Sequence, residues 1–129
     1  MKLCGLLVAS TLLGLSGAAT LLAPGAEAHH SAAMFDKSKT MTLSGTVKEL
    51  EWTSPHCWIQ LMTSGDAGPA EWSIEMGAPF ELVRSGWRPS SLKPGDKVTV
   101  VINPTRSGTK GGLFVSAMDG AGRPIGKAS

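Results

Sequence analysis

Residues 41–52 read Met-Thr-Leu-Ser-Gly-Thr-Val-Lys-Glu-Leu-Glu-Trp, and this stretch decides the fold class. Its first apolar residues alternate with serine and threonine, which is the period-two pattern of a strand with one buried face. Gly45 interrupts the alternation, and Leu50 and Trp52 then fall on the other parity. A glycine inside a strand predicts a bulge or a sharp bend. We therefore expect a bent strand that wraps around a small barrel.

Four more segments downstream have strand character and are separated by glycine and proline turns: 57–63, 70–76, 97–102 and 113–118. Between the third and fourth strands, residues 79–84 can form a short helix with proline in its first turn and Gly86 as its stop. This order is that of a five-stranded OB-type barrel. The sequence thus predicts an all-β fold, a small OB-like barrel with one short helix between strands 3 and 4. An open sandwich and an SH3-like barrel are the alternatives, since strand order alone does not fix closure.

The first 28 residues have the organisation of a cleavable signal peptide. Lys2 precedes an apolar run over residues 3–23, and Pro24-Gly25 leads to the small-x-small tripeptide Ala26-Glu27-Ala28. We expect cleavage after Ala28 and a periplasmic or secreted mature protein that has no contact with a membrane. An uncleaved membrane anchor is the alternative, because the run approaches the length that spans a bilayer. The serine, threonine and glycine residues within the run argue against it.

The mature chain is long enough for one domain. We expect an OB-like barrel over residues 29–118 and a flexible tail over 119–129, which is rich in glycine and polar residues. Cys57 is the cysteine that remains after processing, so no disulfide can form within the chain. We expect its side chain to be buried as a small hydrophobic group.

Charge and composition argue against two classes of function. The net charge is +2, and removal of Lys2 and Glu27 with the signal leaves it unchanged. The basic residues are scattered, whereas a nucleic-acid protein usually has a clustered basic face. No serine has the context of an activated nucleophile, and strand parity predicts that Glu71 and Glu75 face solvent. We therefore expect a protein that is not an enzyme and does not bind nucleic acid.

The histidines are the candidate metal ligands. Cleavage after Ala28 would give His29 a free α-amine beside its ring Nδ1, and these two nitrogens can chelate one metal ion. His56 is the predicted third ligand and His30 competes with it. Nitrogen-rich tetragonal sites favour Cu(II), so copper is the predicted cofactor. The alternative is that the two histidines form a solvated chain start without a metal role.

Tryptophans are the other candidate site residues. Trp52, Trp58 and Trp87 can offer ring faces to a saccharide or peptide, and Trp52 and Trp87 flank turns. Tryptophans at strand positions of a small domain are alternatively part of its core, with their ring nitrogens hydrogen-bonded.

An ordered set of motifs extends along the mature chain. The motifs are His29-His30-Ser31, Phe35-Asp36, Gly45-Thr46-Val47, Glu51-Trp52-Thr53-Ser54-Pro55-His56-Cys57-Trp58, Trp72 with Glu75, Gly77 and Pro79, Gly86-Trp87 and Leu92-Lys93-Pro94-Gly95-Asp96. Together they resemble a family of small exported bacterial proteins classed as a domain of unknown function. The resemblance implies that the motifs around His29 and His56 are parts of one common pattern. The chain departs from the family at Ser54, where asparagine is usual, at Cys57, where a small apolar residue is usual, and at Ala32, where an aromatic residue is common.

Our leading functional prediction is an exported, non-enzymatic OB-like module that binds a small ligand at its rim, with Cu(II) as the first candidate. The main alternative is a metal-independent module that holds a protein or saccharide partner through a strand edge or through its tryptophans. A further alternative is an accessory domain of a copper enzyme.

Overall fold

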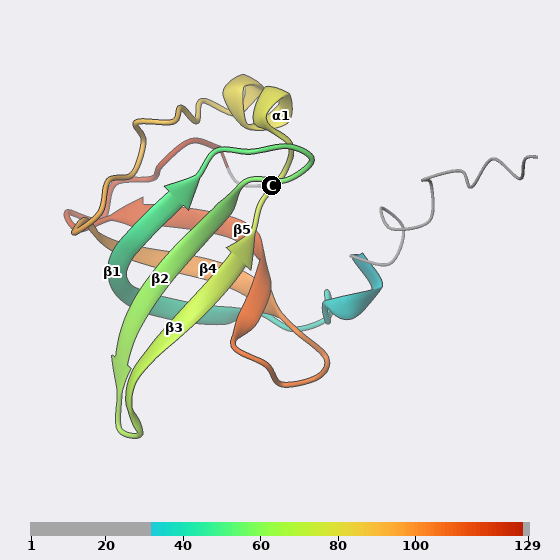
Figure 1. The fold of residues 1–129 in the computed structure, drawn as a ribbon, viewed down its shortest axis with the longest axis vertical. Helices are drawn as coiled ribbons and strands as arrows, with labels where there is room; N and C mark the ends of the chain where they lie inside the picture. Colours follow the sequence, from blue (N-terminus) through green and yellow to red (C-terminus); the bar gives the residue numbers. More distant parts are fainter. Residues whose placement is uncertain (1–31, 128–129) are drawn as a thin grey trace, which may run out of the picture.

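The structure is a computed structural model that describes residues 32–127. Its elements in chain order are η1 (Ala32–Met34), β1 (Met41–Glu51), β2 (Trp58–Gly65), β3 (Gly68–Glu75), α1 (Pro79–Arg84), β4 (Lys97–Pro104) and β5 (Gly111–Asp119). The strands close into a barrel in the order β1-β2-β3-β5-β4 (Figure 1). This confirms the predicted all-β, OB-like barrel of five strands with one short helix between strands 3 and 4. None of the helices in residues 32–127 is both long and apolar enough to cross a membrane.

β1 is the strand that closes the barrel, because its first half pairs with β4 and its second half with β2. Both ladders include Gly45. A Cβ atom at this position would lie 2.3 Å from the backbone oxygen of Met62, so the close approach of β1 and β2 requires glycine. The expected bulge is displaced along the strand, since the register shifts between Val47 and Glu49. The glycine therefore permits close contact, and the irregularity itself follows it.

β2 and β3 form a long hairpin that projects beyond the barrel (Figure 1). The sequence predicts that these strands end at residue 63 and begin at residue 70, but they continue to Gly65 and from Gly68 and leave a two-residue turn. Gly68 has a φ of 94° at this turn, a conformation that favours glycine. The tight turn fixes the hairpin register, in which Trp58 lies opposite Glu75.

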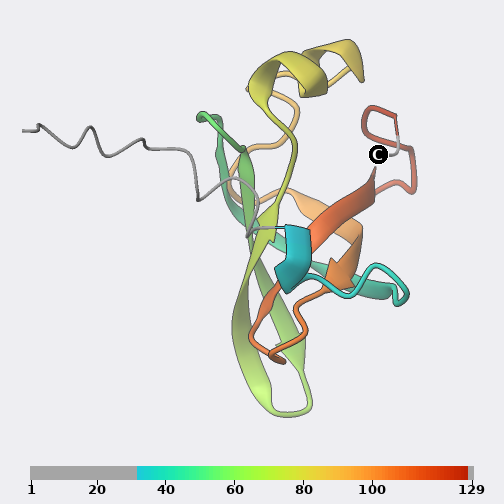
Figure 2. The same cartoon turned by 90° about the vertical axis from the view of Figure 1, so that its right-hand side faces the viewer.

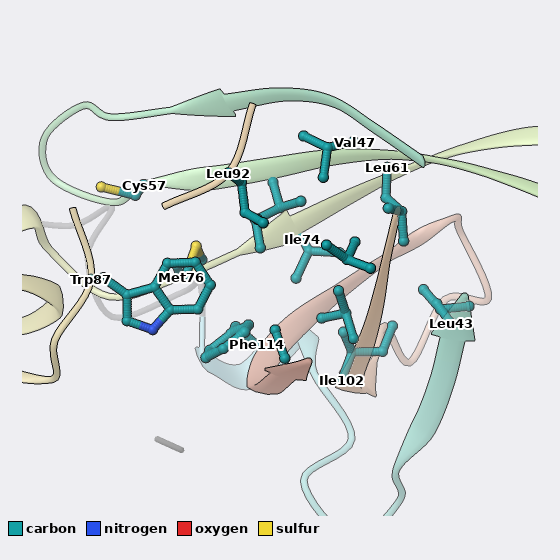
Figure 3. Close-up of a cluster of buried hydrophobic side chains, with 14 of the residues drawn as sticks. Leu43, Val47, Cys57, Leu61, Ile74, Met76, Trp87, Leu92, Ile102 and Phe114 are labelled. Carbon is teal, nitrogen blue, oxygen red and sulfur yellow. The ribbon is translucent and has the colours of Figure 1, made fainter. Parts of the chain in front are cut away.

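Side chains from all five strands, from α1 and from the segment after it form one core cluster (Figure 3). Trp87 is completely buried in it and packs edge-on against Phe114, with ring centroids 5.4 Å apart. This corrects the prediction that Trp87 offers its ring to a ligand. The chain turns sharply at Gly86, which has a φ of 89°, and the backbone N–H of Trp87 donates to the carbonyl of Leu82. The indole is thereby directed back into the barrel.

The segment after β5, predicted as a flexible tail, folds back against the barrel through residue 127. The backbone N–H of Ile125 donates to the carbonyl of Ala117, and that of Lys127 donates to the carbonyl of Ser85. Ile125 also packs against the core cluster. A single apolar residue gives no periodic signal, so the sequence pattern did not reveal this contact.

Candidate functional site

His56 lies in the connection between β1 and β2, one residue before the buried Cys57. The backbone N–H of Cys57 donates to the carbonyl of Gly77, and that of Met76 donates to the carbonyl of Cys57. These bonds extend the β2–β3 ladder past the ends of both strands. They hold the β1–β2 connection beside the carboxyl end of β3, close to the point where the chain leads into α1 (Figure 1). His56 lies there beside Glu75 and Met76.

Both nitrogens of the His56 ring face defined groups. Nδ1 lies 3.2 Å from the carbonyl oxygen of Met76, which can only accept, so Nδ1 carries the proton of this hydrogen bond. Nε2 lies 3.7 Å from Oε1 of Glu75. A neutral ring that donates from Nδ1 has a lone pair at Nε2, and a carboxylate is also an acceptor. This geometry is favourable when a proton or another cation lies between the two atoms.

Glu75 is buried, with 6% of its surface exposed, although strand parity predicted a solvent-facing charge. It lies on the outer face of β3, as the alternation requires, opposite Trp58 on β2 and paired with Leu113 on β5. Sequence reasoning missed this residue as part of the site. The signal that could have found it is the two-residue turn at Asp66-Ala67, because a tight hairpin there sets Trp58 against Glu75.

The residues that follow His56 and Glu75 in the sequence both contain sulfur, and both are turned to the other face. Cys57 is 0% exposed and Met76 is 1% exposed. The burial predicted for Cys57 is thus confirmed. Burial raises the pKa of the Cys57 thiol, and its Sγ donates to the carbonyl of Thr53 over 3.7 Å.

A row of polar side chains continues the site across the outer face of the sheet. Gln60 Nε2 donates to Glu51 Oε1, and Ser73 Oγ donates to Gln60 Oε1, both over 2.7 Å. Trp58 is half-buried on this face, next to Glu51 on one side and Glu75 on the other. The row holds the Glu51 carboxylate in place beside Trp58.

The other tryptophan predicted to contact a ligand, Trp52, directly follows β1. It is half-buried and packs against the core cluster. Of the predicted ligand-contacting tryptophans, Trp58 is therefore the one that shares an outer face with Glu75.

His29 and His30 lie outside the described residues. The described chain that follows them runs beside the end of β4, where Phe35 pairs with Thr105. The N–H of Thr105 donates to the carbonyl of Gly111 at the start of β5. Gly111 in turn pairs with Ser73 on β3, two residues before Glu75. Figure 2 shows η1 in front of β3 and β5 on this side of the barrel.

Within residues 32–127, no group of three or more histidine, cysteine, aspartate and glutamate side chains converges as a metal site. His56 and Glu75 provide two adjacent donor atoms, one nitrogen and one oxygen. A complete site at this position would need further donors from outside the described residues or from solvent.

Comparison with known proteins identifies the family of the chain and assigns no activity. No curated protein and no solved structure matches it. The model of a family of unknown function (DUF6152) matches residues 18–115, which include η1, β1 to β4 and the start of β5. His56, Glu75 and Trp58 all lie in the matched region. Because the match covers most of the chain, the protein belongs to this family of unknown function, DUF6152.

Proposed function

We propose that this protein is an exported, non-enzymatic module that binds Cu(II) at His56. The observation that carries the proposal is the orientation of the ring, whose Nδ1 is held by the carbonyl of Met76 while Nε2 faces Glu75. Histidines that bind metals generally donate their other ring N–H to a carbonyl or a carboxylate, which fixes the ring and leaves the ligating nitrogen free. His56 has this arrangement.

Glu75 is the second proposed ligand. Bonds from first-row metals to nitrogen and carboxylate oxygen are about 2.0–2.2 Å long. One ion can therefore contact both Nε2 and Oε1 across the 3.7 Å that separates them. The burial of Glu75 favours this role, because a buried carboxylate is stabilised by a cation beside it.

His29 is proposed to supply the remaining nitrogen donors after cleavage behind Ala28, through its α-amine and ring, with His30 as the competing ligand. Three nitrogens and one oxygen favour Cu(II) in a tetragonal geometry. The course of the chain supports the proposal. Phe35 pairs with Thr105 just after β4, and Thr105 is hydrogen-bonded to Gly111 at the start of β5. Gly111 pairs with Ser73 on β3, two residues before Glu75.

The test uses protein purified after export, with intact mass confirming that it starts at His29. Cu(II) is titrated against a competing chelator for the wild type, for His56→Gln and for a form with one extra methionine before His29. Removing a supporting residue of a metal ligand typically weakens binding 10–100-fold, so we expect His56→Gln to weaken it at least about 100-fold. The extra methionine should weaken binding as strongly, because it displaces the amine from the chelate ring.

Glu75→Gln and Glu49→Gln form a matched pair, since each removes one carboxylate and Glu49 is exposed on β1. We expect Glu75→Gln to weaken Cu(II) binding about tenfold and Glu49→Gln to leave it unchanged. Equal binding by the wild type and the form with extra methionine would reject the amine chelate. Undiminished binding by His56→Gln, or no binding by the wild type below micromolar concentrations, would reject the copper function.

A further inference from the structure

We infer that the outer face of α1 is a peripheral membrane contact that binds the surface of an anionic lipid bilayer. The inference goes beyond the proposed copper site and does not depend on it. It also departs from the expectation, drawn from the sequence, that the mature protein has no contact with a membrane. Two exposed apolar residues of α1 and three basic residues around its carboxyl end carry the inference.

The apolar residues are Phe80 and Val83. Their exposed fractions are 63% and 42%, and Phe80 is the most exposed large hydrophobic residue within residues 32–127. The two positions are three residues apart, so the side chains lie on one face of the helix. Leu82 points the other way, into the core cluster, and is 4% exposed. α1 therefore packs one side on the barrel and leaves an apolar side in water.

Three basic side chains surround the carboxyl end of the same helix. Arg84 is the last residue of α1 and is exposed. The guanidinium of Arg88 donates to the carbonyl of Val83 over 3.1 Å. The backbone N–H of Lys127 donates to the carbonyl of Ser85 over 2.7 Å, so this lysine also lies at the helix end. None of the ion pairs within residues 32–127 involves these three side chains, and their charges are available to an anionic partner.

Glu81, the carboxylate of α1, lies toward the opposite end of the helix. Its Oε2 accepts the backbone N–H of Ala78 over 3.0 Å, which holds the carboxylate at the first turn. The helix thus separates its negative charge from the basic residues. Figures 1 and 2 both show α1 at one end of the molecule, opposite the tip of the β2–β3 hairpin. A helix in this position can reach a flat surface without obstruction by the barrel.

The size and composition of this face favour a lipid surface over a protein partner. A stable protein interface buries about 800 Å² on each side, and two apolar side chains on a six-residue helix offer only a small part of that area. A peripheral membrane helix needs less, because its apolar side chains enter the boundary of the acyl chains while its basic residues meet anionic headgroups. Phe80 and Val83 have the first role, and the three basic residues have the second.

The experiment measures cosedimentation of the exported protein with vesicles, without copper. Intact mass must first show that the signal has been removed, because a retained apolar segment would itself bind lipid. One set of vesicles contains equal amounts of phosphatidylglycerol and phosphatidylcholine, and the other contains phosphatidylcholine alone. We expect binding to the anionic vesicles that weakens as salt is added, and binding to the neutral vesicles that is at least about fivefold weaker.

Two pairs of variants locate the contact. Arg84→Gln should weaken binding to the anionic vesicles about fivefold, whereas Arg106→Gln, which removes the same charge between β4 and β5, should leave it nearly unchanged. Phe80→Ser should weaken binding about tenfold, and Met34→Ser, at a residue that is 56% exposed, should not. All four residues are exposed, and circular dichroism checks that each variant is folded.

Insertion of the ring is tested with Phe80→Trp and Met34→Trp. Lipids that carry bromine on their acyl chains should quench the added fluorescence of Phe80→Trp and not that of Met34→Trp, because quenching requires close contact. A wild type that does not bind the anionic vesicles, or equal losses of binding in Phe80→Ser and Met34→Ser, would overturn the inference. A dimer of the wild type that Phe80→Ser dissociates, without vesicle binding, would instead assign this face to a second copy of the chain.

Discussion

Gly126 lies directly against the indole ring of Trp87. A Cβ atom at residue 126 would be 2.3 Å from Nε1 of the ring, and the residue has a φ of 64°. Nε1 itself is buried and has no hydrogen-bond partner within the part of the chain that the structure describes. The end of the chain thus covers the largest core side chain through a position that has no room for a side chain.

We predict that Gly126→Ala destabilises the protein more than Gly122→Ala does. Gly122 also has a positive φ, 78°, but its Cβ would meet nothing within 4 Å. Gly122→Ala should cost about 1–2 kcal/mol for the left-handed conformation. Gly126→Ala should add about 1–3 kcal/mol, because it overpacks the core. Urea unfolding followed by tryptophan fluorescence measures both, and equal destabilisation would show that the contact with Trp87 contributes nothing.

The sequence indicated His56 but not the residue it faces. His56 follows a turn at a strand start, and such a position favours a half-exposed ring. The alternation of side chains along β3 correctly predicted that Glu75 lies on the outer face of the strand. This face is nevertheless buried where β3 meets β5. Trp87 was wrongly predicted to offer its ring to a ligand, because a residue after a glycine turn can be directed inward as well as outward. Burial at both positions depends on tertiary contacts, which alternation does not encode.

At the scale of the element, the packing of β1 against its neighbours depends on one residue, Gly45. Gly45 belongs to two ladders and has the backbone of Met62 against its Cα. A backbone oxygen cannot move aside as a flexible side chain can, so the approach of β1 and β2 leaves no room for substitution.

We predict that Gly45→Ala costs at least about 1–3 kcal/mol of unfolding free energy, because the added methyl group forces the two strands apart. Gly65→Ala is the matched control in the same sheet. Its Cβ would meet nothing within 4 Å and its φ is not positive, so we expect a change within about 0.5 kcal/mol. Denaturant unfolding of both variants makes the comparison. A Gly45→Ala protein as stable as Gly65→Ala would contradict the assigned role of Gly45.

Elements with a clear local signal were predicted well. The helix begins at Pro79 and ends at Arg84 as expected, because proline fixes its start and Gly86 its stop. The hairpin was predicted too short, since Gly65, Gly68 and Pro69 all have the composition of a loop. Pairing across β2 and β3 outweighs these weak strand propensities, which depend strongly on context.

At the scale of the whole molecule, the turn after β5 joins the end of the chain to the barrel. Asp119 holds this turn, because its carboxylate accepts the backbone N–H groups of Ala121 and Arg123 and pairs with the Arg123 guanidinium. The hydrogen bond from the backbone of Arg123 is the main reason why the pKa of Asp119 is lowered, and the guanidinium adds to it.

We predict that this carboxylate makes the stability of the molecule depend on acid. A carboxyl group with a lower pKa in the folded state stabilises the fold above its unfolded pKa, about 3.8, and this contribution is lost as the pH falls through the folded pKa. Asp119→Asn should therefore be less stable than the wild type at pH 7, and the difference should shrink below about pH 4. Urea unfolding at pH 7 and pH 3 measures it. A difference that is the same at both pH values would contradict the prediction.

Closure of the barrel is the part of the architecture that sequence patterns could not fix. It depends on two pairings between distant segments, β1 with β4 and the short parallel contact of β3 with β5 over residues 73–75 and 111–113. Neither involves a local turn, so neither leaves a signal in the spacing of apolar residues. The five strands follow from periodicity, and their closure follows from the side chains that fill the barrel together.

Gly45 belongs to two ladders, and the partners of these ladders lie at very different distances along the sequence. In a chain that is synthesised from its amino end, the partners of the two halves of β1 therefore become available at different times. The second half of β1 can pair with β2, and β2 with β3, once residue 75 has left the ribosome. The first half has its partner only later, since Met41 pairs with Ile102. Pairing over such a sequence separation is slow, because the intervening chain must first be ordered. The two halves of β1 therefore differ in the length of chain that their pairing must order, which is short for β2 and long for β4.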